Sequence, residues 1–383
     1  MDNFDLAVVG GGLAGAATAC FAALSGARVV LIERRDLNLA ASGSNAGSIH
    51  AQIPFDPFRT LGAEWARAYA RTIPLFMASI ERWKELESEL GGGLGVSTRG
   101  GLMVAGSRAD LGLLEEKADI ERAAGLPVEM WSRAELAARA PFLTDDLCGA
   151  AFCPIEGKAD PLKAAPLFAL RAREAGCLVL RDHPVEAIER VAGGFLLRAG
   201  GREIMASRIV NAAGAEAARI AAMVGVEIAL EGHPIQVAVT EKGPAELPWL
   251  LYYTGEKLTL KQAADGGYLI GGGWSADRAR DGDPTGARVN GSSMARNLAV
   301  AARVLPGLSD LRVVRSWAAV VNGTADWRPI LGETPGVPGF FLNLFPWMGF
   351  TAAPAVSEAI ADLALGRRPA IDLAEFCPPP ATP

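Results

Sequence analysis

Three glycines and a glutamate near the start of the chain have the types and spacing of a phosphate-binding turn. Gly10, Gly12 and Gly15 form a Gly-x-Gly-x-x-Gly pattern, and Glu33 follows it. The first glycine permits a tight turn, the second lets a pyrophosphate approach the backbone, and the third lets a helix pack closely on a strand. A carboxylate at Glu33 can accept hydrogen bonds from both hydroxyls of an adenosine ribose. The pattern predicts a dinucleotide site, for which FAD and NAD are both candidates.

The segments around this pattern are those of a βαβ unit. The apolar run 6–9 is typical of a strand buried on both faces, the small residues 16–24 predict a helix, and the run 28–32 predicts a second strand. A helix N-terminus presents unpaired N–H groups and a partial positive charge to phosphates. An isolated glycine-rich turn would lack these flanking elements.

The composition bounds the size and class of the protein. The chain has 383 residues, half of them hydrophobic, which is enough for two domains or one large one. A net charge of −6 and a pI near 5.4 argue against nucleic acid as the main partner. Mean hydropathy is +0.21, yet no apolar run reaches the ~18 residues of a membrane span, so none is expected.

The cysteines give no sign of a metal site. They lie at positions 20, 148, 153, 177 and 377 and form no Cys-x-x-Cys pair, so we expect neither zinc nor an iron–sulfur cluster. Scattered cysteines fit a reducing compartment. Because the first strand begins close to Met1, we expect no signal peptide and a cytoplasmic protein.

Further along, helical and strand patterns alternate. The patterns predict helices over 64–90 (with a break near Pro74), 109–124, 133–139, 161–175, 293–304 and 351–365. They predict strands over 101–105, 177–180, 184–188, 195–198, 203–206, 208–211, 236–240, 250–254, 257–262, 268–271 and 340–344. The strands between 236 and 271 are expected to form a separate antiparallel sheet.

Several segments together resemble a known family. They are the loop 42–47 (Ser-Gly-Ser-Asn-Ala-Gly), the run 209–214, and the tail from 329–332 to 349–351. With the βαβ unit, they resemble the D-amino-acid-oxidase-like superfamily of FAD-dependent amine oxidoreductases over nearly the whole chain. Segments 45–50 and 316–333 are most similar to the catalytic (beta) subunits of opine oxidases. They also resemble heteromeric D-hydroxyproline and proline dehydrogenases and hydrogen cyanide synthase.

The resemblance implies FAD as the cofactor and an α/β fold. That fold would be a Rossmann-like FAD-binding domain with a second, mostly antiparallel β-sheet substrate domain flanked by helices. We expect a discontinuous FAD-binding domain over 1–85, 150–226 and 320–383, and a substrate-binding domain over 86–149 and 227–319.

The resemblance also implies which residues contact FAD. The loop 42–48 would run beside the flavin ring, Val185 would pair the adenine edge through its main chain, and 349–351 would place a helix N-terminus near the flavin N1–C2=O edge. For Gly349, a simple strand–helix turn is the alternative interpretation. The implied contacts are Gly10, Gly12, Leu13, Ala14, Gly15, Glu33, Arg34, Ser42, Asn45, Ala46, Gly47, Ser48, Val185, Ala213, Gly214, Met348, Gly349, Phe350 and Thr351.

The implied reaction moves a hydride from the substrate Cα–H to flavin N5, with the amine neutral and with no nucleophile or metal required. In many relatives an arginine shortly before an Asp-x-x-Pro-x-x-Gly segment binds the substrate carboxylate. Aligned on Asp326, that position falls at Val321. This departure argues against simple D-amino-acid or glycine oxidation and is shared by the opine-oxidase-like relatives.

Three residues are candidates for catalysis or substrate binding. Lys261 shares a strand face with Thr259 and is a candidate cation for a carboxylate, as is Arg328; a solvated surface charge is the alternative for both. His50 follows the flavin loop and is expected to touch substrate or flavin, or else to be a hydrogen-bonded loop histidine. Tyr252, Tyr253 and Trp274 are expected either to wall the pocket or to pack in the core.

These observations lead to one main hypothesis and two alternatives. The main one is an FAD-dependent amine dehydrogenase or oxidase acting on an amino acid, imino acid or N-substituted amino acid of the opine or D-hydroxyproline class. As the resemblance implies, electrons would pass to a partner subunit with its own redox centres. The alternatives are a stand-alone D-amino-acid, sarcosine or glycine-type oxidase that uses O2, and a non-catalytic flavoprotein subunit.

Overall fold

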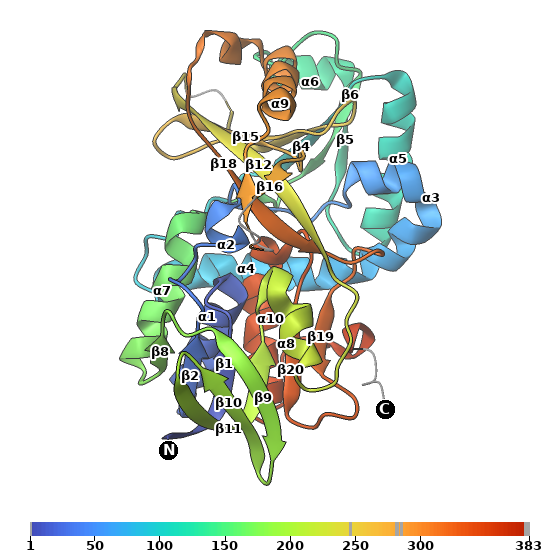
Figure 1. Ribbon diagram of the computed structural model, residues 1–383. Helices are drawn as coiled ribbons and strands as arrows, with labels where there is room; N and C mark the ends of the chain where they lie inside the picture. The colour runs from blue at the N-terminus through green and yellow to red at the C-terminus, as the bar shows by residue number, and fades with distance from the viewer. Residues whose placement is uncertain (1, 245–246, 280–282, 284–285, 379–383) are drawn as a thin grey trace.

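The computed structural model describes residues 2–244, 247–279, 283 and 286–378. Its strands form two main sheets, one above the other in Figure 1, with helices packed on each. No helix in these ranges is both long and apolar enough to cross a membrane. The α/β fold predicted from the sequence is confirmed, including the mostly antiparallel second sheet.

The first sheet is built around the βαβ unit at the N-terminus. β1 pairs in parallel with β2 on one side and β11 on the other, and the main strand order is β19-β20-β11-β1-β2-β8. β9 and β10 continue from β11 as an antiparallel extension. The strands are β1 (Asp2–Val9), β2 (Val29–Ile32), β8 (Leu178–Leu180), β9 (Val185–Val191), β10 (Gly194–Ala199), β11 (Arg202–Asn211), β19 (Ile330–Glu333) and β20 (Phe340–Leu344).

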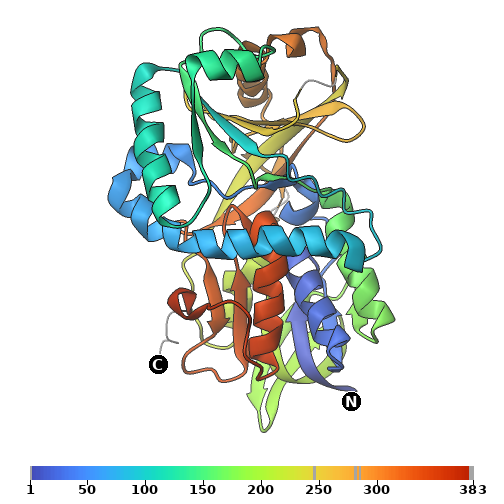
Figure 2. The same ribbon diagram turned by 180° about the vertical axis from the view of Figure 1, so that it is seen from behind.

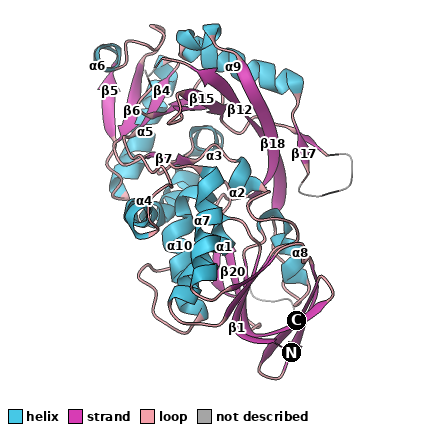
Figure 3. Cartoon of the chain, turned by 90° about the vertical axis from the view of Figure 1, so that its left-hand side faces the viewer, coloured by secondary structure: helices cyan, strands magenta, loops and turns pink. Residues whose placement is uncertain are grey.

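Three helices cover one face of this sheet. α1 (Leu13–Leu24) packs between α7 (Pro161–Glu174) and α10 (Gly349–Ala364), as Figure 1 shows. Figure 3 shows the three helices gathered beside the sheet. The small residues of α1 allow this close packing, since most of its alanines are buried. The Asp160 side chain caps α7 by accepting from the backbone N–H of Leu162 at 2.9 Å, as the sequence predicts.

A long helix fixes the position of the N-terminus of α10. α4 (Ile73–Glu89) runs across the molecule and packs on α10 (Figure 2). Trp83 of α4 donates to the Thr351 carbonyl at 3.1 Å, and Ser79 donates to the Ala352 carbonyl at 2.7 Å. The first turn of α10 is therefore held by side chains from a helix far away in the sequence.

The second sheet has the order β18-β12-β15-β14-β13-β4-β6-β5. Its neighbours pair antiparallel, while β4 and β13 pair in parallel. The strands are β4 (Gly101–Ala105), β5 (Glu129–Ser132), β6 (Gly149–Cys153), β12 (Glu231–Lys242), β13 (Leu250–Tyr253), β14 (Thr259–Gln262), β15 (Gly267–Gly271) and β18 (Val313–Gly323). The helices α5 (Arg108–Ala123), α6 (Arg133–Arg139) and α9 (Gly291–Val304) flank it.

Short elements connect the two sheets. β3 (Ser48–Ile49) pairs with β7 (Gly157–Lys158), which ties the loop after β2 to the segment that follows β6. The other elements are α2 (Ala41–Ser44), α3 (Phe55–Tyr69), α8 (Ala217–Ala222), β16 (Asp277–Arg278), β17 (Ala287–Arg288), and the 3-10 turns η1 (Ala70–Thr72), η2 (Gly214–Glu216), η3 (Pro306–Asp310) and η4 (Ala374–Phe376).

Some elements differ from the predicted ones. The stretch 64–90 predicted as one helix or two belongs to α3 and α4, separated at residues 70–72, and α3 begins earlier, at Phe55. The segment predicted as the loop 42–48 contains most of α2 and the start of β3. All strands of the first sheet lie within the ranges expected for the FAD-binding domain, 1–85, 150–226 and 320–383. These ranges also contain most of β6 and the end of β18, which belong to the second sheet.

Candidate active site

A cleft of about 120 Å³ opens at the carboxyl ends of β1 and β2. The carboxyl ends of parallel strands are the usual location for a dinucleotide in this kind of sheet. The cleft gathers predicted contacts from several separate segments: Gly10, Gly12, Glu33, Arg34, Ser42, Val185, Ala213 and Gly214. The structure thus brings this part of the predicted cofactor set together.

The glycines of the turn have no room for side chains. A Cβ on Gly10 would lie 2.5 Å from the Ala212 carbonyl oxygen, and Gly10 has a φ of +112°. A Cβ on Gly15 would lie 1.8 Å from the carbonyl oxygen of Gly10. The turn therefore requires glycine at both positions, because backbone atoms cannot move aside without shifting the strand or the helix.

Two polar side chains at the same cleft accept hydrogen bonds from backbone N–H groups. Glu33 accepts from the Gly11 N–H at 2.7 Å through Oε2 and from the Arg35 N–H at 2.9 Å through Oε1. The Ser42 hydroxyl accepts at 3.0 Å from the Leu13 N–H, which lies in the first turn of α1 and has no partner within the helix. A cleft lined by glycines, a helix N-terminus and an ordered carboxylate fits the nucleotide end of FAD.

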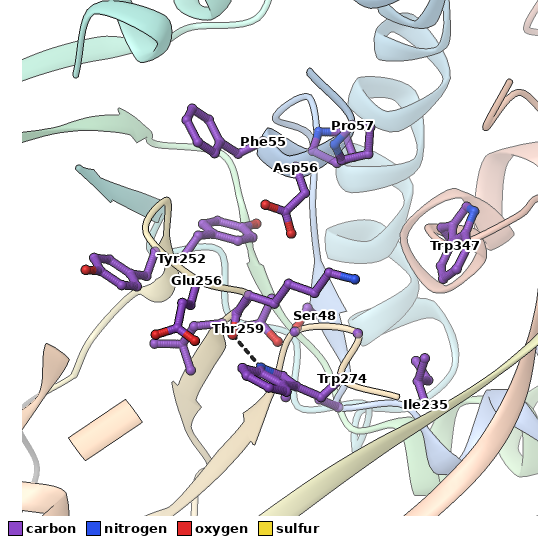
Figure 4. A pocket seen from close by; sticks show the side chains of 18 of the residues that line it. Ser48, Phe55, Asp56, Pro57, Ile235, Tyr252, Glu256, Thr259, Trp274 and Trp347 are labelled. Atoms are coloured by element: carbon purple, nitrogen blue, oxygen red, sulfur yellow. Dashed lines mark hydrogen bonds between the residues drawn. The ribbon is translucent and has the colours of Figure 1, made fainter. Parts of the chain in front are cut away.

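A second cavity, of about 1360 Å³, lies between the two sheets. Figure 4 shows Ser48, Tyr252, Thr259, Trp274 and Trp347 around it. The predicted cofactor contacts Asn45, Ala46, Ser48, Met348 and Phe350 line this cavity, as do His50, Val321 and Tyr253. Ser42 at the first cleft and Asn45 at the second lie at most one turn apart, in α2 and at its end, so a single extended cofactor can serve both spaces.

The remaining predicted contacts form hydrogen bonds or close backbone contacts near the segment 42–50 and in the first turns of α1 and α10. Thr351 accepts from the His50 N–H at 2.8 Å. A Cβ on Gly47, whose φ is +73°, would lie 2.1 Å from the Ala159 carbonyl oxygen. Leu13 and Gly15 belong to the packed first turn of α1, and Ala14 accepts there from Ser357 at 3.1 Å. Gly349 begins α10.

Two tryptophans form one wall of the second cavity. Trp327 and Trp347 are stacked with ring centroids 4.6 Å apart, and both have positive φ, 68° and 58°. Val321 lines the same cavity, so the position that carries arginine in many relatives is apolar here. The cations that line the cavity in the described part of the chain are Arg59, Lys257 and Arg296.

A chain of partly buried hydrogen bonds begins at His50. Its Nδ1 lies 2.7 Å from the Tyr252 hydroxyl, which in turn lies 3.0 Å from Oε2 of Glu156. Burial and the nearby Lys261 lower the pKa of His50 to about 3, so this imidazole is neutral at physiological pH. Burial raises the pKa of Tyr252, and the carboxyl of Glu156 raises it further.

A buried ion pair lies next to this chain. Lys117 and Glu121 are both fully buried and lie 2.5 Å apart. Glu121 also accepts from the Ile53 N–H at 2.6 Å, while Glu156 accepts from the N–H groups of Ala51 and Gln52. The sequence analysis missed Glu156, Lys117 and Glu121, because no local pattern connects them with the loop after His50.

The structure places the other two catalytic candidates differently. Lys261 is buried behind the cavity wall, where its amine donates to the Ser48 hydroxyl at 2.6 Å, and burial lowers its pKa. Thr259, on the same strand face, does line the cavity. Arg328 pairs with Glu375 at 2.6 Å and covers the Phe376 ring, so it anchors the C-terminal segment and is not among the described lining residues.

The neutral state of His50 predicts a pH-dependent stability. A histidine with a depressed folded pKa stabilises the fold above its unfolded pKa of 6.5, and this contribution is lost as pH falls toward 3. We expect the change from pH 7 to pH 5 to cost wild type up to about 2 kcal/mol more than His50→Gln. Urea unfolding at both pH values measures the difference. Equal losses in the two proteins would contradict a neutral buried His50.

Among the described residues no cluster of histidine, cysteine, aspartate or glutamate is arranged to hold a metal ion. The observed site consists of a nucleotide cleft, a large neighbouring cavity and a hydrogen-bonded network, which suits a cofactor-dependent reaction on a small molecule.

The chain is similar to known proteins over most of its length. A family model described as DAO, FAD dependent oxidoreductase, matches residues 5–363. An opine oxidase subunit of Rhizobium meliloti is 30% identical over 348 residues, covering 89% of this chain and 88% of that protein. The corresponding opine oxidase subunit of Agrobacterium tumefaciens strain Ach5 is 31% identical, with the same coverage.

A solved structure shows the same fold at lower identity. Glycine oxidase from Geobacillus kaustophilus superposes with a TM-score of 0.86 at 24% identity, covering 99% of both chains.

Proposed function

Because the chain belongs to the DAO family of FAD-dependent oxidoreductases, we propose that it oxidises the C–N bond of an amino acid, imino acid or N-substituted amino acid. Opines and D-hydroxyproline are the proposed substrate classes. The observation that carries this proposal is that one segment, residues 42–48, lines both the nucleotide cleft, at Ser42, and the cavity that holds His50, at Asn45, Ala46 and Ser48.

The chain's own residues have separable roles in this proposal. Bound FAD supplies the hydride acceptor. The N-terminus of α10, at Gly349, presents its positive end to the cavity. Met348, Phe350 and Trp347 exclude water from one side. Lys261 is proposed to hold the loop through Ser48, and His50 to contact the substrate nitrogen.

The shape and charge of the cavity favour an extended substrate. The volume of about 1360 Å³ leaves room for more than a flavin ring and glycine. Charged groups lie on the side formed by α3 and α9, where Arg59 pairs with Asp56 and Arg296 with Glu256. A substrate with a second polar group away from the reacting bond, as an N-carboxyalkyl amino acid has, would reach them.

We propose that the electrons leave to a partner subunit that carries its own redox centres. The two opine oxidase relatives are named as subunits, and so is a relative named as the beta subunit of sarcosine oxidase in Rhizobium meliloti strain 1021, which is 24% identical. The described residues of this chain offer no metal cluster to relay the electrons further.

Anaerobic reduction of the purified holoprotein tests the proposal. We expect bleaching of the flavin by opines or by D-hydroxyproline, and little peroxide when oxygen is admitted. Bleaching by glycine or simple D-amino acids, with one peroxide per turnover, would favour a stand-alone oxidase. Bleaching by no member of the panel would favour a non-catalytic role. Co-purification of redox partners from the native host tests the electron route separately.

A further inference from the structure

The backbone after His50 is held by carboxylates. The N–H groups of Ala51 and Gln52 donate to Oε1 of Glu156 at 2.5 and 2.7 Å, and the next N–H, of Ile53, donates to Glu121. These consecutive amides therefore converge on two buried acids. Such an arrangement fixes the chain direction, and with it the place of the His50 ring.

Glu156 is surrounded by donors. Besides the two amides on Oε1, its Oε2 accepts from the Gln52 side-chain amide and from the Tyr252 hydroxyl, each at 3.0 Å. The fold also leaves space for this carboxylate, because a Cβ on Gly101 would lie 1.7 Å from Oε2. Burial raises the pKa of Glu156, and these hydrogen bonds oppose that effect, because four donors favour a carboxyl group that acts only as an acceptor, the ionised form.

The direction of these bonds determines the tautomer of His50. Because the Tyr252 hydroxyl donates its hydrogen bond to Glu156, the tyrosine oxygen can only accept from His50. The proton of the neutral imidazole therefore lies on Nδ1. No described residue makes a hydrogen bond with Nε2, and His50 lines the cavity. The free lone pair of the imidazole is therefore available to a molecule in the cavity.

We propose that Glu156 is a positioning residue that, through Tyr252, holds His50 as the Nδ1–H tautomer so that Nε2 accepts a hydrogen bond from the nitrogen of a neutral amine substrate. This inference deepens the proposed function and rests on it. The site would thus select the free-base form of the amine and orient its nitrogen before the C–H bond is broken.

No proton is transferred to His50, and no covalent bond forms or breaks in this step. The N–H of the free amine donates to Nε2, and the neutral ring keeps its Nδ1–H bond to Tyr252, which donates to Glu156. The nitrogen lone pair stays available, and hydride loss requires it.

The charges near the His50 ring have opposite effects on its pKa. The Lys261 amine disfavours the imidazolium, whereas the Glu156 carboxylate, one tyrosine away, favours it. Lys117 and Glu121 neutralise each other. Burial and Lys261 prevail, so the ring is neutral and stays neutral when an amine donates to Nε2.

Nitrogen NMR of the holoenzyme tests the tautomer without any substrate. The chain has only three histidines, at 50, 183 and 233, so protein labelled with ¹⁵N-histidine gives few signals, and His50→Asn identifies the relevant ones. We expect a protonated Nδ1 and an unprotonated Nε2 in wild type, with no titration between pH 5.5 and 8. An Nε2–H tautomer or an imidazolium in wild type would overturn the proposal.

Two variants address the relay behind the ring. In Glu156→Gln the amide oxygen must face the Ala51 and Gln52 N–H groups, which leaves the amide NH₂ facing Tyr252. The tyrosine should then donate to His50, and the tautomer should switch to Nε2–H. Tyr252→Phe should leave neither tautomer fixed. The control Tyr253→Phe makes the same chemical change one residue along β13 and should leave the His50 signals as in wild type.

Stopped-flow reduction of the flavin supplies the second readout. With a substrate that bleaches wild type, we expect Glu156→Gln to slow reduction about 100-fold, because the Nε2–H tautomer would donate to the nitrogen lone pair that hydride loss requires. Slower reduction without a switch of the His50 tautomer would indicate a structural role only and would contradict the relay. If no amine bleaches the wild type, the proposed function fails, while the tautomer experiment still reports on the positioning by Glu156.

Discussion

Replacing Gly15 with alanine should weaken the binding of FAD and lower the FAD content of the purified protein. The new Cβ would lie 1.8 Å from the Gly10 carbonyl oxygen and 3.4 Å from the Ala212 side chain. α1 would have to move away from the turn, and its first-turn N–H groups would move away from the phosphates. Forcing a methyl group into such a contact costs about 1–3 kcal/mol, which weakens FAD binding about 10- to 100-fold.

Gly112→Ala is the matched control for this substitution. Gly112 lies within α5, and a Cβ there meets nothing within 4 Å. Alanine should keep full FAD content and raise the stability by up to about 1 kcal/mol, since glycine is a poor helix former. The ratio of flavin to protein absorbance and calorimetric titration of the apoprotein with FAD measure both variants. Normal FAD affinity in Gly15→Ala would exclude the glycine turn as the nucleotide site.

Removing the amine of Lys117 should destabilise the fold by about 3–5 kcal/mol. In Lys117→Met the Glu121 carboxyl stays fully buried without its partner at 2.5 Å. Burial already raises the pKa of Glu121, and the lysine opposes that effect. Glu121 also holds the Ile53 N–H, so the loop that follows His50 should loosen as well.

The double variant Lys117→Met/Glu121→Gln distinguishes the charge effect from lost packing. Glutamine keeps an oxygen for the Ile53 N–H but removes the unpaired charge, so much of the stability should return. The free energy of urea unfolding measures all three proteins. If the double variant is no more stable than Lys117→Met, the loss is one of packing and not of charge pairing.

The nucleotide cleft could be predicted because its signals are local. Gly10, Gly12 and Gly15 lie in one short turn, and the flanking strands 6–9 and 28–32 are uninterrupted apolar runs. The parallel pairing of β1 with β2 and β11 then brings 213–214 to the same cleft. Each step follows from periodicity and turn chemistry, which a single sequence carries.

The network behind His50 could not be predicted for the opposite reason. Tyr252 lies 202 positions along the chain from His50, and Glu156 lies 105 positions from Ala51. Their contact depends on the parallel pairing of β4 with β13 and on the β3–β7 ladder. No local pattern specifies which distant strands pair, so the acid could not be assigned.

The expectation for Lys261 shows how far strand alternation reaches. Alternation correctly places Thr259 and Lys261 on one face of β14, and Thr259 does line the cavity. Lys261, however, lies under Ser48, because β3 covers that part of the sheet. Alternation gives the face of a strand, but not what covers that face.

The stacked tryptophans have a consequence for how the substrate range of this enzyme can evolve. Bulky residues at positive φ store about 1–3 kcal/mol of backbone strain each, and here the stacking of Trp327 on Trp347 opposes that strain at both positions. A mutation of either ring alone would leave its neighbour strained and without a stacking partner. Adaptation to new substrates along this wall should therefore show strong epistasis, with paired replacements tolerated better than single ones.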